Sequence, residues 1–112
     1  MPSKEERKEA IRKFKERKPA VGIFAVRCRT TGDVWVGASR NLDATRTGAW
    51  FALRLGSYPH RGLQQEWNRH GEPAFAYEVL DTLDDDVLAM SVGDVLKEKR
   101  VRWVAQLAAK PL

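Results

Sequence analysis

The feature that most constrains the fold is a pair of short apolar runs in residues 21–39, VGIFAVRCRTTGDVWVGAS. Both runs are rich in β-branched and aromatic residues, which fit the pleated, half-buried surface of a β-sheet. The residues Thr30 to Asp33 lie between the runs and are typical of a turn. The segment therefore predicts a β-hairpin whose two strands each carry one glycine, Gly22 and Gly37.

Length and charge limit the class of protein. The 112 residues are enough for one domain with a single modest core. The formal net charge of +5 favours an acidic partner, nucleic acid before an anionic membrane. No apolar run is long enough for a signal peptide or a membrane span, so we expect a cytoplasmic protein that has no membrane partner.

Cys28 is the only cysteine of the chain, which excludes an intrachain disulfide and a cysteine-rich zinc site. This cysteine usage is typical of a reducing, intracellular compartment. We expect Cys28 to be a small buried hydrophobe. A reactive thiol between Arg27 and Arg29 is the alternative.

Residues 1–18 form a basic segment ahead of the domain, which we place at residues 19–112. Ser3 and Glu6 have the spacing of a capping box, and Pro19 follows, so the segment predicts a helix over residues 4–17. Eight Lys or Arg residues against four Glu leave it at +4. The helix either lies along phosphates or is a solvated helix with internal ion pairs.

The rest of the chain predicts further helices and one more strand. A helix is expected after Asn41 or Asp43 and before Gly56, and a short helix ends at Gly71. Residues 74–83, AFAYEVLDTL, alternate as a strand, and residues 92–108 have the pattern of an amphipathic helix. The order predicts a small α+β domain with a three-stranded, mainly antiparallel sheet flanked by helices.

The two glycine-containing runs also resemble a known family. GIF and WVG, ten residues apart and followed by Ala-Ser-Arg-Asn-Leu, resemble the paired signature of the GIY-YIG nuclease superfamily, which includes homing endonucleases and excision-repair nucleases. The later stretch LRLGSYPHRGLQQEWNRHGEPAFAYEVLDTL is similar to the continuation of that family, so the resemblance spans residues 21–107. It implies that Gly22 and Gly37 let the paired backbones and a substrate phosphate approach closely.

The resemblance implies catalysis by two motif tyrosines, a helix arginine and a metal-binding glutamate, and this chain departs at each position. Phe24 and Trp35 stand in place of the tyrosines, so both hydroxyls are missing. The arginine position, eight residues after Gly37, holds Thr45, and Arg46 comes one residue later. Because one residue turns a helix by about 100°, Arg46 is either a displaced substitute or a solvent-exposed arginine.

The glutamate position, three residues before the pair Trp103-Val104, holds Arg100. A cation does not ligate magnesium, and Glu98 points to nearly the opposite side of the same helix. Arg100 either contacts a phosphate through two of its guanidinium nitrogens or packs its stem while its head pairs with an acid such as Glu78 or Asp81. The sequence leaves these two roles open.

The sequence predicts a GIY-YIG-like domain with eroded catalytic residues that binds nucleic acid, DNA more than RNA, and needs no cofactor. The expected nucleic-acid contacts are Lys13, Lys15, Arg17, Arg40 and Arg46.

Two alternatives remain. One is an endonuclease that uses Mg²⁺ or Mn²⁺ and a shifted set of residues drawn from Arg46, Tyr58, His60 and Glu98. The other is a scaffold that binds a protein through the first helix or through an exposed Trp35. The two histidines, His60 and His70, have no partners spaced for a metal site or a triad, and Tyr77 is expected in the core.

Overall fold

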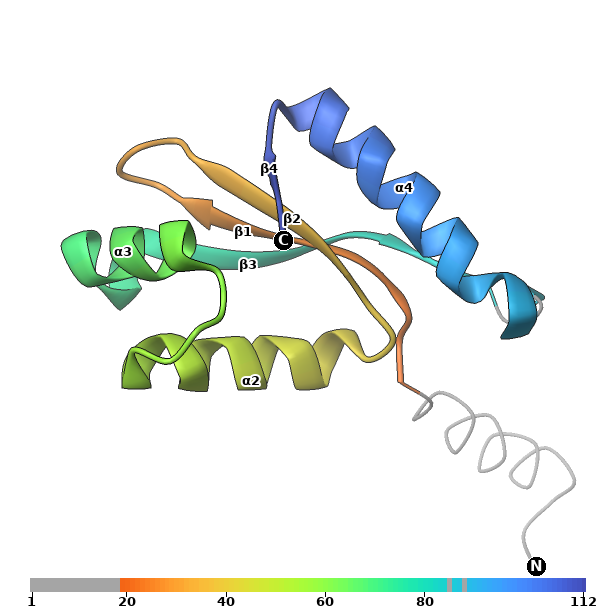
Figure 1. The fold of residues 1–112 in the computed structure, drawn as a ribbon, viewed down its shortest axis with the longest axis horizontal. Helices are drawn as coiled ribbons and strands as arrows, with labels where there is room; N and C mark the ends of the chain where they lie inside the picture. The colour runs from red at the N-terminus through yellow and green to blue at the C-terminus, as the bar shows by residue number, and fades with distance from the viewer. Residues whose placement is uncertain (1–18, 85, 88) are drawn as a thin grey trace, which may run out of the picture.

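The computed structural model describes residues 19–84, 86–87 and 89–112, so the basic helix expected over residues 4–17 lies outside the described residues. The described chain forms a four-stranded sheet in the order β3-β1-β2-β4, with α-helices on both faces (Figure 1). The strands are β1 (Gly22–Cys28), β2 (Val34–Ser39), β3 (Phe75–Thr82) and β4 (Lys110–Pro111). The helices are α2 (Leu42–Leu55), α3 (Arg61–His70), α4 (Val92–Leu107) and two short 3-10 turns, η1 (Glu72–Ala74) and η2 (Ala89–Ser91).

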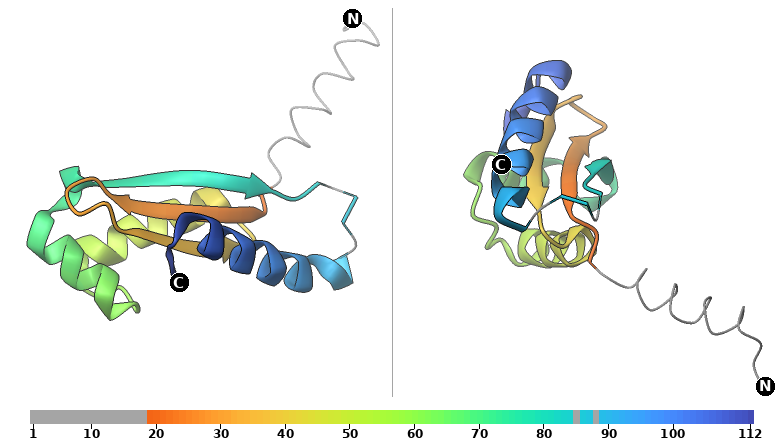
Figure 2. Two further views of the ribbon diagram at one scale, coloured as in Figure 1. Left: turned by 90° about the horizontal axis from the view of Figure 1, so that it is seen from above. Right: turned by 90° about the vertical axis from the view of Figure 1, so that its right-hand side faces the viewer.

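The predicted hairpin is confirmed. β1 and β2 pair antiparallel, with Phe24 opposite Gly37 and Val26 opposite Trp35. Gly32 closes the turn at a φ of +79°, a conformation that glycine adopts without strain, and its N–H donates to the Cys28 carbonyl at 2.8 Å. The left view of Figure 2 shows β3, β1 and β2 side by side.

Local signals set the ends of the helices, as the sequence predicts. The Asn41 side chain accepts the backbone N–H of Ala44 at the start of α2, and Gly56 ends this helix at a left-handed φ of +76°. Helix α3 ends at Gly71, whose N–H donates to the Trp67 carbonyl. Gly56 therefore fixes where the segment between α2 and α3 begins.

Two cores form because both faces of the sheet are covered (Figure 1). The α2/α3 core lies between the sheet and these two helices, and its buried members are Phe24, Val26, Cys28, Trp35, Leu42, Leu53, Leu63, Trp67 and Phe75. The α4 core lies on the other face, and its buried members are Ile23, Ala25, Val36 and Leu96. Cys28 is thus a buried core residue, as expected.

The expectation of a three-stranded sheet is wrong, because β4 adds a fourth strand and runs parallel to β2. Ala108 adopts a left-handed φ of +49° after α4 and turns the chain back toward the sheet. The N–H of Leu112 then donates to the Val36 carbonyl at 2.8 Å. Two residues carry no alternating pattern, so the sequence gives no sign of this strand.

A register shift in β1–β3 pairing changes which face of the sheet the last residues of β3 lie on. The irregularity lies between Ile23 and Phe24, which pair with Asp81 and Val79. Val79 pairs with Phe24, so it keeps the face of Tyr77 although it is 47% exposed. Past the bulge, Asp81 pairs with Ile23 and lies on the α4 side of the sheet, as Leu80 does. Close to this bulge, a Cβ on Gly22 would lie 1.9 Å from the Asp81 carbonyl oxygen, so only glycine fits there.

Candidate functional site

The aromatic side chains of the two motif strands, β1 and β2, point to the face of the sheet that α2 and α3 cover. Phe24 and Trp35 belong to one buried cluster on neighbouring antiparallel strands, with 4% and 0% of their surface exposed. Gly37 makes room for the first of these rings, because a Cβ there would lie 2.7 Å from Phe24 Cζ. The Gly37 position is thus explained by aromatic packing within the chain.

The burial of Trp35 corrects one alternative, that an exposed Trp35 docks a partner protein. Trp35 points into the α2/α3 core, and its neighbour Val36 points into the α4 core. The Trp35 indole Nε1–H has no hydrogen-bond partner among the described residues. Lys110 on β4 holds its Nζ 5.5 Å from the centre of the Trp35 ring, a cation–π contact.

Phe24 belongs to a continuous group of aromatic rings. Its ring stacks on Tyr77 with centroids 5.3 Å apart, and Trp50 of α2 meets Tyr77 edge-on at 6.0 Å. The Tyr77 hydroxyl donates to the backbone carbonyl of Leu42 at 2.8 Å. Tyr77 packs against the α2/α3 core, as expected from its strand position.

The pKa of Tyr77 is raised to about 12, mainly by burial and also by the Asp43 carboxylate, while the Arg46 guanidinium acts in the opposite direction. Removing the phenolic proton would also break the hydrogen bond to Leu42. Tyr77 is therefore a poor substitute for the missing motif hydroxyls, because a general base must lose and regain its proton near the working pH.

The junction between β2 and α2 holds the position at which the resemblance implies an arginine. Thr45 points inward there, and its hydroxyl shares a 2.5 Å hydrogen bond with the hydroxyl of Ser39. Ser39 also accepts the backbone N–H of Asn41 at 2.9 Å. Arg46 is exposed on α2, which agrees with its solvent-exposed reading.

Arg40 is exposed at the same junction and reaches toward α4. Its Nη2 lies 3.5 Å from the point where a side chain at Gly93 would begin. Among the described residues, no carboxylate pairs with Arg40 or Arg46 within 4.0 Å. The two guanidinium groups thus stand at one end of α2 without a described acid partner.

Arg100 is half-buried on α4, and its Nη1 donates to the backbone carbonyl of Leu112 at 3.4 Å. The proposed pairing of Arg100 with Glu78 or Asp81 is wrong. Glu78 accepts from Arg27 at 2.5 Å, and Asp81 accepts from Lys99 at 3.0 Å. Both acids lie on β3, and each forms an ion pair with a cation other than Arg100.

The Asp81 carboxylate also accepts from the Trp103 indole at 3.3 Å. The hydrogen bond from Lys99 is the main cause that holds the pKa of Asp81 below its ordinary value. Glu98, on the outer side of the same helix, is exposed and pairs with Arg102 one turn later at 2.8 Å. The carboxylates near α4 therefore serve ion pairs within the chain.

The side chain at the implied metal-binding position does not fit a divalent cation. Arg100 occupies the position at which the resemblance implies the metal-binding glutamate, and a guanidinium has no lone pair to offer. Within residues 19–84, 86–87 and 89–112, no three His, Cys, Asp or Glu side chains gather as a metal site requires.

The remaining candidates, Tyr58 and His60, lie in the segment between α2 and α3. The His60 side chain caps α3, since its Nδ1 accepts the N–H of Leu63 at 3.2 Å. Tyr58 packs against the α2/α3 core, and burial raises the pKa of its hydroxyl. Both residues thus have structural contacts that explain them.

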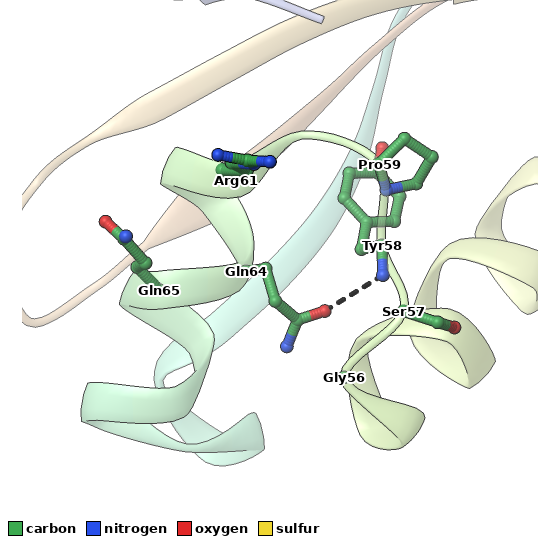
Figure 3. A pocket seen from close by; sticks show the side chains of 7 residues that line it. All are labelled: Gly56, Ser57, Tyr58, Pro59, Arg61, Gln64 and Gln65. Carbon is green, nitrogen blue, oxygen red and sulfur yellow. Dashed lines mark hydrogen bonds between the residues drawn. The ribbon is translucent and has the colours of Figure 1, made fainter.

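An open pocket of about 340 Å³ lies beside this segment, lined by residues 56–59 and by Arg61, Gln64 and Gln65 (Figure 3). Gln64 is the buried residue of the set, and its side chain is fully engaged. Its Oε1 accepts the N–H of Tyr58 at 3.1 Å, and its Nε2 donates to the Leu53 carbonyl at 3.0 Å and to the Asn68 side chain. Sequence reasoning missed this residue, because a polar residue within an amphipathic helix carries no sign of its partners.

No helix among the described residues combines the length and the apolar character of a membrane span. The expected contacts Lys13, Lys15 and Arg17 lie outside the described residues.

The structure brings together Phe24, Trp35, Gly37 and Tyr77 on one face of the sheet. It leaves Arg100 on the other side of the sheet, with α4.

Comparison with known proteins identifies the fold. The catalytic domain of the homing endonuclease I-TevI is similar at a TM-score of 0.70 and 19% identity, over 82% of this chain and 97% of that one. A mutant of the catalytic domain of the intron endonuclease I-TevI is similar at 0.67 and 20% identity, over 80% of this chain and 84% of that one. No family model matches the chain, and no curated protein sequence is a significant match. The chain thus has the fold of the GIY-YIG endonuclease catalytic domain, which confirms at the level of the fold the resemblance seen in its two motif strands.

Proposed function

We propose that this chain is a nucleic-acid-binding module on a GIY-YIG fold whose hydrolytic groups have been replaced. The observation that carries the proposal is the stacking of Phe24 on Tyr77. These packed rings fill the α2/α3 side of the motif strands. Hydrolysis of a phosphodiester needs a proton acceptor and groups that stabilise charge on the phosphate oxygens. The motif positions offer no proton acceptor, and their one cation, Arg100, donates to a backbone carbonyl of the chain itself.

Each motif position has a non-catalytic explanation in the fold. Phe24 and Trp35 have no hydroxyl and are buried. Thr45 is bonded to Ser39, and Arg100 is directed at a backbone carbonyl. The alternative endonuclease gains no support from Tyr58 or His60, which pack and cap within the chain.

Charge supports the nucleic-acid partner. Residues 1–18 carry +4 of the formal net charge of +5, so the positive charge is concentrated in one segment. Arg40 and Arg46 add two exposed guanidinium groups at one end of α2. Such cations favour phosphate backbones, whose neutralisation releases counterions.

DNA is the proposed partner in preference to RNA, because the structures that resemble this fold are those of an intron or homing endonuclease. The test is fluorescence anisotropy with labelled duplex DNA, single-stranded DNA and duplex RNA of equal length, over a series of salt concentrations. We expect tightest binding to DNA and a dissociation constant that rises steeply with salt.

The matched variants are Arg40→Glu with Arg46→Glu, and Arg69→Glu with Arg102→Glu as the control. The control pair removes the same number of exposed arginines from positions that already have acid partners. Only the first pair is expected to weaken binding beyond the change in net charge. An equal loss of affinity in both pairs would show that the effect comes from overall charge. Undetectable binding at low salt would refute the proposed function.

A further inference from the structure

The solvent side of α2 carries a glycine that the chain itself does not explain. Gly48 lies in the middle of a 14-residue helix, where glycine is less favourable than alanine. A Cβ added there would meet no atom within 4 Å, so no packing contact in the described chain requires glycine. Gly37 is different, because its missing side chain makes room for Phe24.

Gly48 belongs to an exposed stripe, which consists of Ala44, Gly48, Phe51 and Leu55. At about 100° per residue these four positions fall within about 60° of arc, opposite the buried side of the helix. Phe51 is 62% exposed and Leu55 is 65% exposed. The spacing of four, three and four residues is that of one seam of a helix pair.

We propose that this α2 stripe is the contact surface of a homodimer in which two copies of α2 pack antiparallel. The stripe has small residues in its N-terminal half and large ones in its C-terminal half. In an antiparallel pair, Phe51 of one copy lies over Gly48 of the other, and Leu55 lies over Ala44. A twofold axis makes both contacts twice, which is the self-complementarity that a symmetric interface requires.

Gly48 then has a purpose, because a helix position without a side chain lets a partner helix and a large aromatic ring approach closely. A parallel pair would instead set Phe51 against Phe51 and Gly48 against Gly48, which leaves one end crowded and the other empty. The arrangement of sizes therefore selects the antiparallel orientation.

Charge agrees with this orientation. Asp43 lies in the first turn of α2 and Arg54 in its last turn, on the same flank of the stripe. An antiparallel pair places the Arg54 end of one copy beside the Asp43 end of the other, twice. The two helix dipoles also oppose each other favourably. Arg54 already pairs with Glu72, and a guanidinium has donors for both carboxylates.

The size of the α2 stripe limits the expected affinity of the homodimer. Two heptads of one helix bury less than the roughly 800 Å² per partner of a standard interface. The dimer is therefore weak and forms reversibly with concentration. This inference does not depend on nucleic-acid binding, and its test is made without nucleic acid.

The test is sedimentation equilibrium of the full chain from micromolar to millimolar concentration. We expect a monomer–dimer equilibrium that Phe51→Glu weakens at least about 10-fold, because an aromatic anchor at an interface centre is replaced by a charge. The matched control is Val101→Glu on α4, where the valine is 60% exposed and outside the stripe. It should leave the equilibrium unchanged.

A second variant separates dimerisation from folding. Gly48→Ala should raise the melting temperature of the monomer by about 4 °C, since alanine favours the helix, and should still weaken the dimer. A monomer at every concentration would overturn the proposal. So would a dimer that Phe51→Glu leaves intact, or one that Val101→Glu weakens equally.

Discussion

The ring of Phe24 lies nearly parallel to the ring of Tyr77, with 5.3 Å between centroids and 19° between planes. The contact joins the first motif strand to β3 across the sheet. Because the Tyr77 hydroxyl donates a hydrogen bond to the Leu42 carbonyl, the stack also connects the sheet to the first residue of α2. An aromatic pair of this kind contributes about 0.5–1.5 kcal/mol beyond its buried area.

The hydroxyls of the two tyrosines should ionise at a higher pH than that of a free tyrosine. Burial raises the pKa of Tyr58, and it raises that of Tyr77 to about 12. Because the folded state favours the protonated form, the contribution of Tyr77 to stability is complete below pH 10 and is lost as the pH rises from about 10 to 12. In the Tyr58→Phe variant, where Tyr77 is the remaining tyrosine, absorbance at 295 nm should show little phenolate at pH 11 in the native protein and full ionisation after denaturation. A native midpoint near pH 10 would contradict this.

Removing the Tyr77 hydroxyl should destabilise the fold. Tyr77→Phe removes the hydroxyl donor to the Leu42 carbonyl and should lower the free energy of unfolding by about 0.5–1.5 kcal/mol in denaturant titrations. Tyr58→Phe is the control, since no hydrogen bond of the Tyr58 hydroxyl is present among the described residues. If both variants lose the same stability, the bond to Leu42 contributes nothing specific.

The protein should not cleave DNA. Supercoiled plasmid incubated at neutral pH with Mg²⁺ or Mn²⁺ is expected to remain intact, because both motif hydroxyls are missing and Arg100 replaces the implied metal ligand. Nicking by the parent protein that is lost in Glu98→Ala or Arg46→Ala would instead establish the shifted-residue endonuclease. Metal binding gained by Arg100→Glu together with Phe24→Tyr and Trp35→Tyr would support the positional assignment.

The basic segment should provide most of the affinity for nucleic acid. Replacing Lys13, Lys15 and Arg17 by Glu should weaken binding to all sequences alike and flatten its salt dependence, because phosphate contacts carry little base information. Anisotropy titrations at several salt concentrations measure both effects. Replacing Arg69, Lys97 and Arg102 by Glu controls for net charge. An unchanged dissociation constant in the first variant would place the binding surface elsewhere.

Two glycine-to-alanine changes should have opposite effects. Gly37→Ala forces the Phe24 ring to move and should cost about 1–3 kcal/mol, as overpacking does. Gly48→Ala meets open space in a helix and should stabilise the monomer by about 1 kcal/mol. Thermal and denaturant unfolding at low protein concentration measure both changes. A neutral Gly37→Ala would show that the ring relocates freely.

Elements set by neighbouring residues were predictable from the sequence. The hairpin, the Asn41 cap and the glycine ends of α2 and α3 each depend on a few adjacent positions. The fold could be inferred for the same reason, because its two motif strands lie close together in the chain. The basic helix of residues 4–17 remains a prediction, outside the described residues.

Contacts between distant segments were not predictable. β4 exists because Ala108 turns the chain and Val36 offers a free carbonyl, and neither fact appears in a two-residue pattern. Arg100 bonds to Leu112 rather than to an acid for the same reason. Trp35 is buried because helices cover both faces of the sheet, whereas a single strand pattern does not tell which faces are covered.

The bonds of Gln64 decide how the helices on one face can move. A single buried side chain holds the last turn of α2, the backbone of the connecting segment and the next turn of α3. A connection held at three points is a rigid corner rather than a hinge, even though it lies at the surface. Force applied to the outer side of α2 is therefore transmitted to α3, and the amide of Tyr58 should exchange with solvent as slowly as those of the helices it joins.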